Sequence, residues 1–199
     1  MFWSCNKSVN KADLLTSFEL NSESVHIINQ NKDIFEAFKS MNQEESRSAF
    51  NTLTTAEMEA LWLSNLKEFS ENRKFTREQI SSLRLFEEIM SNIDNYSDLK
   101  SVEEIWLEQS SPYFTRYEVF SLAYTINKIS NEDFEKVKPS KIIAKDISIP
   151  IGTPGCNCSI SSIFGCIGGT VGSCHSTRCT GGYGCGFEFL FRCGGMCRP

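Results

Sequence analysis

The sequence predicts a mainly α-helical N-terminal domain followed by a small, disulfide-rich C-terminal mini-domain with short β-strands. Three changes of composition near residue 152 support this division. All 12 glycines lie in residues 152–199, the last lysine is Lys145, and Cys5 is the only one of the 9 cysteines before residue 156. Such a change along one chain indicates two units built differently, one held by an apolar core and the other by sulfur.

We divide the 199 residues into four parts. They are an irregular N-terminus over residues 1–30, a helical domain over 31–138, a linker over 139–155 and a cysteine-rich mini-domain over 156–199. The helical domain is long enough to bury an apolar core, whereas chains near ~40 residues usually need disulfides or metal to fold. The linker combines prolines with β-branched residues that lack helical phase, so we expect an extended tether that a processing protease can cut. An edge strand packed on the tail is the alternative for its second half.

Apolar residues recur at helical spacing through residues 32–128 and predict a series of amphipathic helices. The expected helices cover residues 32–41, 43–52, 54–69, 76–92, 101–111 and 115–128, with residues 131–137 adding a last turn or two. Three of them begin at a Ser or Thr followed three residues later by Glu or Gln, the spacing of a capping box. These pairs are Thr54 with Glu57, Thr76 with Gln79, and Ser101 with Glu104. Trp62 and Trp106 fall at apolar positions, so we expect both in the core.

The front part carries little that points to catalysis. His26 is its only histidine and it contains no glycine, which excludes a histidine-based site and a glycine-rich phosphate loop. Adjacent carboxylates occur at residues 44–45, 87–88 and 103–104, and we expect them on solvated helix surfaces. We therefore predict no catalytic residue, no metal site and no cofactor. A scaffold or leader fits this part better than an enzyme does.

The net charge of −5 is unevenly divided. Residues 1–151 carry 17 basic and 24 acidic side chains, which gives −7, and residues 152–199 carry three arginines against one glutamate, which gives +2. The acidic front part argues against nucleic acid as a partner. No apolar stretch reaches the ~18 residues of a membrane-spanning helix, so we expect no transmembrane span.

Eight closely spaced cysteines predict four disulfides in the tail, with 105 possible pairings. They are Cys156, Cys158, Cys166, Cys174, Cys179, Cys185, Cys193 and Cys197. Zinc is the alternative, but structural zinc sites favour two well-separated Cys-x2–4-Cys pairs, and the cysteine gaps here do not follow that spacing. Because disulfides persist in oxidising compartments, we expect an exported protein, either secreted or lipid-anchored at the bacterial cell envelope.

Cys5 is a candidate lipidation site. Residues 2–7 resemble the end of a bacterial lipoprotein signal, in which a small residue precedes the cysteine that becomes lipidated. The charged and apolar regions of such a signal are missing in front of Cys5. We favour a truncated lipoprotein signal over an ordinary thiol, because the tail independently indicates export.

Alternating phenylalanines between Cys185 and Cys193 predict a strand with one aromatic face. The face consists of Phe187, Phe189 and Phe191, and Arg192 lies beside it. We take these four residues as candidates for binding a target-cell envelope or a surface receptor. The alternative is that the phenylalanines form the core of the mini-domain, which has few other large side chains to bury.

Three motifs in the tail carry a resemblance to a known family. They are Cys156-Asn157-Cys158-Ser159, Gly184-Cys185-Gly186-Phe187 and Cys193-Gly194-Gly195-x-Cys197. This frame resembles the C-terminal region of fulvocin C-related bacteriocins, in which a cysteine-rich peptide follows a helical segment with an export or lipoprotein signal. Residues 53–57, followed by Leu61-Trp62, are similar to the front segment of such precursors. The resemblance covers about a quarter of the chain and implies an antibacterial peptide carried on a larger precursor.

Three hypotheses about function therefore stand side by side. The first is a bacteriocin precursor, and the second is a non-toxic extracellular binding, adhesion or inhibitor module. The third is a peptide in which dehydrated Ser and Thr side chains are joined to cysteines as thioethers. Its candidate positions are Ser159, Ser161, Ser162, Thr170, Ser173, Ser176, Thr177 and Thr180. Intact mass separates the third hypothesis, because thioether formation loses water whereas disulfide formation loses hydrogen.

Overall fold

The computed structural model describes residues 15–41, 43–92, 99–126, 173–176, 183–185, 187, 191–192 and 195–198. Within these ranges the protein is mainly helical. The helices are α1 (Ser22–Gln30), α2 (Lys32–Ser40), α3 (Gln43–Phe50), α4 (Thr55–Ser70), α5 (Arg77–Met90), α6 (Leu99–Ser110) and α7 (Arg116–Ala123). The strands are β1 (Ser173–Ser176), β2 (Tyr183–Cys185), β3 (Phe191–Arg192) and β4 (Gly195–Arg198).

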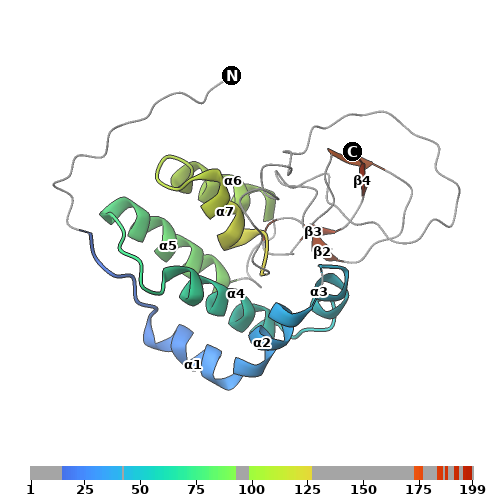
Figure 1. Ribbon diagram of the computed structural model, residues 1–199, viewed down its shortest axis with the longest axis horizontal. Helices are drawn as coiled ribbons and strands as arrows, with labels where there is room; N and C mark the ends of the chain where they lie inside the picture. Colours follow the sequence, from blue (N-terminus) through green and yellow to red (C-terminus); the bar gives the residue numbers. More distant parts are fainter. Residues whose placement is uncertain are drawn as a thin grey trace, which may run out of the picture.

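Helix α4 is the centre of the helical part. It packs against α1 and α2 and also against α5 and α7, while α6 packs on α5 (Figure 1). Every residue from Ala60 to Leu66 is buried, which is typical of a helix surrounded by others. Trp62 and Trp106 are both fully buried, as predicted.

Capping boxes begin three of the helices, and two of them are the predicted ones. The Thr54 hydroxyl accepts from the Glu57 N–H at 3.4 Å, and the Glu57 carboxylate accepts from the Thr54 N–H at 2.7 Å. Thr76 and Gln79 do the same for α5. The third box is Thr115 with Glu118 at α7. The box predicted at Ser101 is wrong, because α6 begins at Leu99 and Ser101 lies inside it.

The N-terminal region is more ordered than the sequence predicts. Residues 22–30, expected to be irregular, form α1, whose first turn is capped by the Asn21 side chain accepting from the Ser24 N–H at 2.8 Å. Phe18 and Ile28 join the core. Thr16 exchanges two backbone hydrogen bonds with Phe75, of 3.0 and 2.9 Å. The helical unit therefore includes residues before 31, and the predicted boundary is too late.

Two asparagines help to end helices in the part of the chain that has no glycine, residues 1–151. Asn72, after α4, takes a left-handed backbone conformation with φ of 58°, which Asn tolerates better than most residues. The Asn65 side chain donates to the carbonyls of Ser121 at 3.1 Å and Leu122 at 2.8 Å. It thereby satisfies acceptors that the end of α7 leaves open.

Loss of the Thr54 cap is expected to destabilise the helical part by about 0.5–2 kcal/mol in Thr54→Ala. Hydrogen bonds from the backbone N–H and the hydroxyl of Thr54 lower the pKa of Glu57. A carboxylate with a lowered folded pKa stabilises the protein above its unfolded pKa and loses this effect as pH falls through the folded value. Thermal melts of wild type and variant should therefore differ most at neutral pH. The share of the difference that comes from the Thr54 hydroxyl donating to the Glu57 carboxylate should vanish below the folded pKa of Glu57, while the share from the hydroxyl accepting from the Glu57 N–H should remain. A difference that is unchanged across that pH range would show that the hydroxyl does not act on the carboxylate.

The tail strands form two separate antiparallel pairs. β1 pairs with β4, with Cys174 opposite Cys197, and β2 pairs with β3 across an irregular register. β2 lies against α3, so this hairpin sits beside the helical part (Figure 1). The predicted single strand from Phe187 to Arg192 is wrong at its start, since Phe187 lies between β2 and β3. Of the residues described between 187 and 192, Phe191 and Arg192 are the ones in a strand.

Candidate functional site

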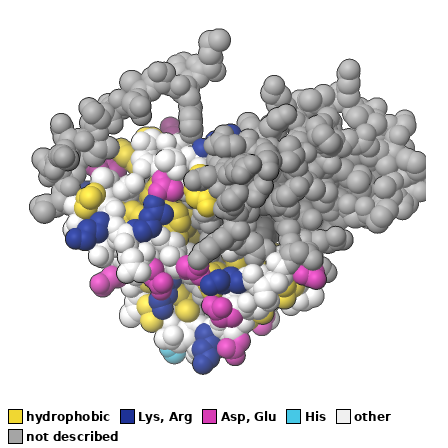
Figure 2. All heavy atoms as spheres, in the orientation of Figure 1, with side chains coloured by type: hydrophobic (Ala, Val, Ile, Leu, Met, Phe, Trp, Pro, Cys, Tyr) yellow, Lys and Arg dark blue, Asp and Glu magenta, His cyan; other side chains and the backbone are white. Residues whose placement is uncertain are grey.

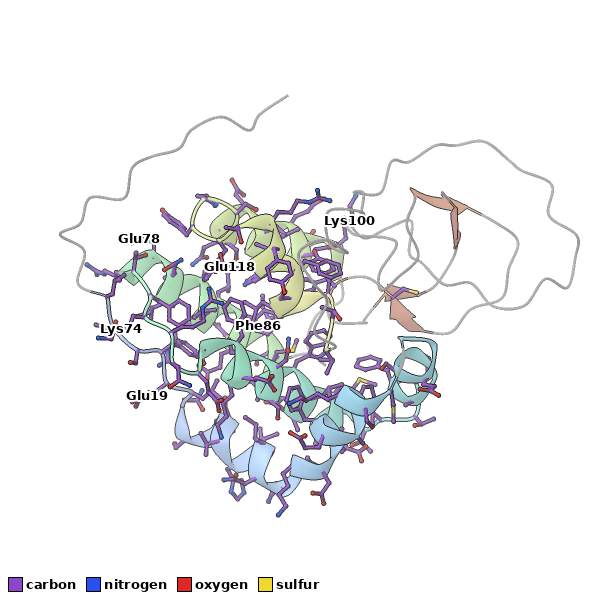
Figure 3. The ribbon with its side chains drawn as sticks, viewed as in Figure 1. Glu19, Lys74, Glu78, Phe86, Lys100 and Glu118 are labelled. Atoms are coloured by element: carbon purple, nitrogen blue, oxygen red, sulfur yellow. The ribbon has the colours of Figure 1, made fainter. Side chains whose placement is uncertain are left out.

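One tail residue, Phe187, is inserted into the core of the helical part. Its side chain is 0% exposed and belongs to the same apolar cluster as the helices. Its ring centroid lies 5.4 Å from that of Trp106 on α6, 5.7 Å from that of Tyr124 after α7 and 6.3 Å from that of Phe86 on α5. The Tyr124 and Phe86 rings meet it edge to face, a favoured geometry for aromatic pairs. We call Phe86, Trp106 and Tyr124 the aromatic pocket; Figure 3 shows Phe86 between the helices.

Hydrogen bonds between α5 and α6 fix Trp106. Its indole N–H donates to the Ser82 carbonyl at 3.3 Å, and the Ser110 hydroxyl donates to the Trp106 carbonyl at 2.7 Å. The hydroxyls of Ser82 and Ser110 are 2.5 Å apart. Buried hydroxyls with partners hold the two helices in one register, and these bonds join residues of α5 and α6 alone.

A buried carboxylate fixes Tyr124. The phenol donates to Glu103 Oε1 at 2.5 Å, and Glu103 is 0% exposed. The ring of Phe120 stacks on that of Tyr124 with centroids 6.1 Å apart. Because buried polar groups are costly to leave without a partner, this hydrogen bond orients the tyrosine ring that contacts Phe187.

Three pairs of adjacent carboxylates were expected on solvated surfaces. For two of these pairs the expectation is wrong for one member, which is buried. Glu103 binds Tyr124 in the interior, and Glu87 is 2% exposed. Glu87 accepts from the Asn21 N–H at 2.8 Å and from Arg84 at 2.5 Å, which ties the start of α1 to α5. The neighbours Glu88 and Glu104 are exposed as predicted. Adjacent positions on a helix point about 100° apart, so one member of such a pair turns inward when its neighbour faces solvent.

The four predicted target-binding residues are only partly placed. Phe187 lies in the helical core, which is neither the exposed face nor the mini-domain core that the sequence suggests. The residues of β3 are Phe191 and Arg192; their side chains, and all of Phe189, lie outside the described part, as does Cys5. In this conformation Phe187 is therefore covered and unavailable to an outside partner.

Among the eight tail cysteines, Cys185 is the one whose side chain is described. It is disulfide-bonded and 2% exposed, at the end of β2. Two residues later the chain inserts Phe187, so this crosslink lies next to the contact with the helices. Cys174 and Cys197 are placed by their backbone alone, as cross-strand partners in β1 and β4.

We expect a disulfide between Cys174 and Cys197 in the oxidised protein. Directly opposed residues of an antiparallel pair have Cα atoms about 4.5–5.5 Å apart, inside the range that a disulfide spans. Fixing this pair reduces the possible connectivities from 105 to 15. Peptide mapping without reduction should yield a crosslinked peptide containing both residues. A map that joins Cys174 to any other cysteine would contradict the expectation.

The surface of the helical part carries mixed charge. Figure 2 shows lysine and arginine side chains interspersed with acidic ones. Lys39 on α2 bonds Glu68 on α4 at 2.7 Å, and this hydrogen bond raises the lysine pKa. Among the described residues, no group of histidine, cysteine and carboxylate side chains is arranged to hold a metal ion, and no helix is long and apolar enough to cross a bilayer.

Comparison with known proteins leaves the chain without a match: no family model, no curated protein and no solved structure is similar to it.

Proposed function

We propose that this protein is the precursor of an exported antibacterial peptide, a bacteriocin, whose active part is residues 156–199. The observation that carries the proposal is the crosslinked tail. Eight cysteines occupy these residues, and Cys185 is disulfide-bonded within a β-hairpin beside the helices. A unit this small relies on crosslinks for stability. Disulfide crosslinks persist in the oxidising conditions outside the cell.

The two parts have different roles in this proposal. The tail is a disulfide-rich mini-domain with short strands, and the helical part is its carrier during synthesis and export. The carrier role is supported by the contact of Phe187 with the aromatic pocket. In this contact the helical part covers an aromatic side chain of the tail. Export as a secreted or lipid-anchored protein, with Cys5 as the lipidation site, completes the proposal.

A killing assay tests the proposed activity. Residues 156–199 are purified in the oxidised state after cleavage in the linker and added at micromolar concentration to a panel of related bacteria. We expect growth inhibition by the separated tail and much weaker inhibition by the uncleaved protein. The matched control is the same tail reduced and alkylated, which retains its sequence and loses its crosslinks.

Each outcome of that assay has a defined meaning. Activity of the alkylated control equal to that of the oxidised tail would show that the stapled fold is not the active species. No inhibition across the panel by oxidised tail would reject the bacteriocin and favour the extracellular binding module. A native mass reduced by multiples of water would instead favour thioether crosslinks.

A further inference from the structure

The contact between the tail and the helices is built like a specific protein interface. One aromatic side chain from the tail, Phe187, enters a pocket whose rings all belong to the helical part. Trp106 and Tyr124 are held in place by their own hydrogen bonds to Ser82 and Glu103. A preorganised pocket filled by one buried aromatic residue is the usual composition of an interface hot spot. A second contact lies close by, where β2 packs against α3.

We propose that the helical part is a non-covalent binding partner of the tail, anchored by Phe187, and that it retains the tail after the linker is cut. Cleavage then yields a complex in which Phe187 remains covered, and release of the tail is a separate step. The inference deepens the proposed function, because the bound tail is the latent form of the proposed peptide. The interaction itself does not depend on what the tail does to bacteria.

The chemistry of the contact predicts how the complex responds to salt. The two parts carry opposite net charges, −7 for residues 1–151 and +2 for residues 152–199, so a purely electrostatic association would weaken as salt is added. The contacts of Phe187 described here are aromatic and fully buried, and apolar burial is not screened by salt. We therefore expect the cut complex to persist at about 1 M salt, where the Debye length is about 3 Å.

The experiment begins with the full chain, folded and oxidised, in which a specific protease site replaces part of residues 139–155. After cutting, size-exclusion chromatography at low and high salt shows whether the two pieces elute together. We expect co-elution for the parent chain in both conditions. Phe187→Ala should weaken the complex at least about 30-fold, the factor that corresponds to loss of one hot-spot side chain. The control is Tyr113→Ala, which removes an aromatic side chain that is 46% exposed and lies outside the aromatic pocket.

Tryptophan fluorescence provides a second readout on the same material. With Trp3→Phe and Trp62→Phe, Trp106 is the only tryptophan left of the 3 in the chain, and its ring lies 5.4 Å from that of Phe187. Dilution of the cut complex should shift the Trp106 emission to the red as Phe187 leaves. In the Phe187→Ala chain the shifted emission should be present before dilution.

Several results would overturn the proposal. They are separation of the parent pieces immediately after cutting, dissociation by salt alone, or equal weakening by Phe187→Ala and Tyr113→Ala. Loss of the helical circular dichroism in Phe187→Ala would also overturn it, because Phe187 would then be indispensable core and not a separable anchor. None of these readouts uses bacteria. A tail that binds but does not kill rejects the proposed function alone, and a tail that kills but never binds rejects this inference alone.

Discussion

Reduction of the disulfides is expected to unfold the tail while most of the helical circular dichroism persists. The four expected disulfides, at about 2–4 kcal/mol each, would contribute roughly 8–16 kcal/mol, which is as large as the whole net stability of an ordinary domain, about 5–15 kcal/mol. The helical part has its own apolar core and no cysteine among its described residues. Two-dimensional NMR of the full chain, oxidised and after a phosphine reductant, separates the two responses.

The expected spectra differ in a specific way between the two parts. Amide signals of the tail glycines should lose their dispersion on reduction, and those of α4 and α5 should keep theirs. Cys5→Ser is the matched control, because it removes the one cysteine outside the tail and should leave the response unchanged. Tail signals that remain dispersed in reductant would show that the crosslinks are dispensable for the fold.

Local signals in the sequence predicted most of the helical fold correctly. Capping boxes and apolar spacing act within a few residues, and they located α2, α4 and α5 to within two residues at each end. Helix α1 was missed because its start depends on contacts far along the chain. Asn21 caps it locally, but the Asn21 N–H is held by Glu87, 66 positions away. The expected helix from residue 115 was also too long, since Asn65 on α4 binds the carbonyls that end α7.

The aromatic pocket was beyond the reach of sequence patterns for the same reason. Trp106 was expected in the core, Phe86 and Tyr124 fell within the expected helices 76–92 and 115–128, and alternation placed Phe187 on a strand. Phe187 lies 101, 81 and 63 positions along the chain from Phe86, Trp106 and Tyr124, respectively, and no local periodicity encodes such a pairing. The buried Glu103 gave no signal either, because its partner Tyr124 is 21 residues away. Composition alone marked the tail as a separate unit, and it did not reveal that the tail fills a place in the helical core.

Replacement of Phe187 by alanine is expected to lower the stability of the helical part, although the substitution lies in the tail. Truncation of a buried Phe typically costs about 3–5 kcal/mol, and Phe187 is 0% exposed among three aromatic rings. At about 2–4 °C per kcal/mol for a protein of this size, the midpoint of thermal unfolding should fall by roughly 6–20 °C. Melts followed by far-ultraviolet circular dichroism, which reports on the helices, measure this shift in the oxidised full chain.

Matched variants separate the pocket contact from a general effect on the tail. Phe187→Leu keeps an apolar side chain in the pocket and should lose only part of the stability, because it fills much of the same volume. Trp106→Phe makes the ring that faces Phe187 smaller. The loss of stability in the double variant Trp106→Phe with Phe187→Ala should be less than the sum of the two single losses, since the two rings are in contact. Reduced wild-type protein should melt near the Phe187→Ala midpoint, because an unfolded tail no longer holds the Phe187 ring in the aromatic pocket. A Phe187→Ala chain whose helices melt at the wild-type temperature would show that the helical core is complete without the tail.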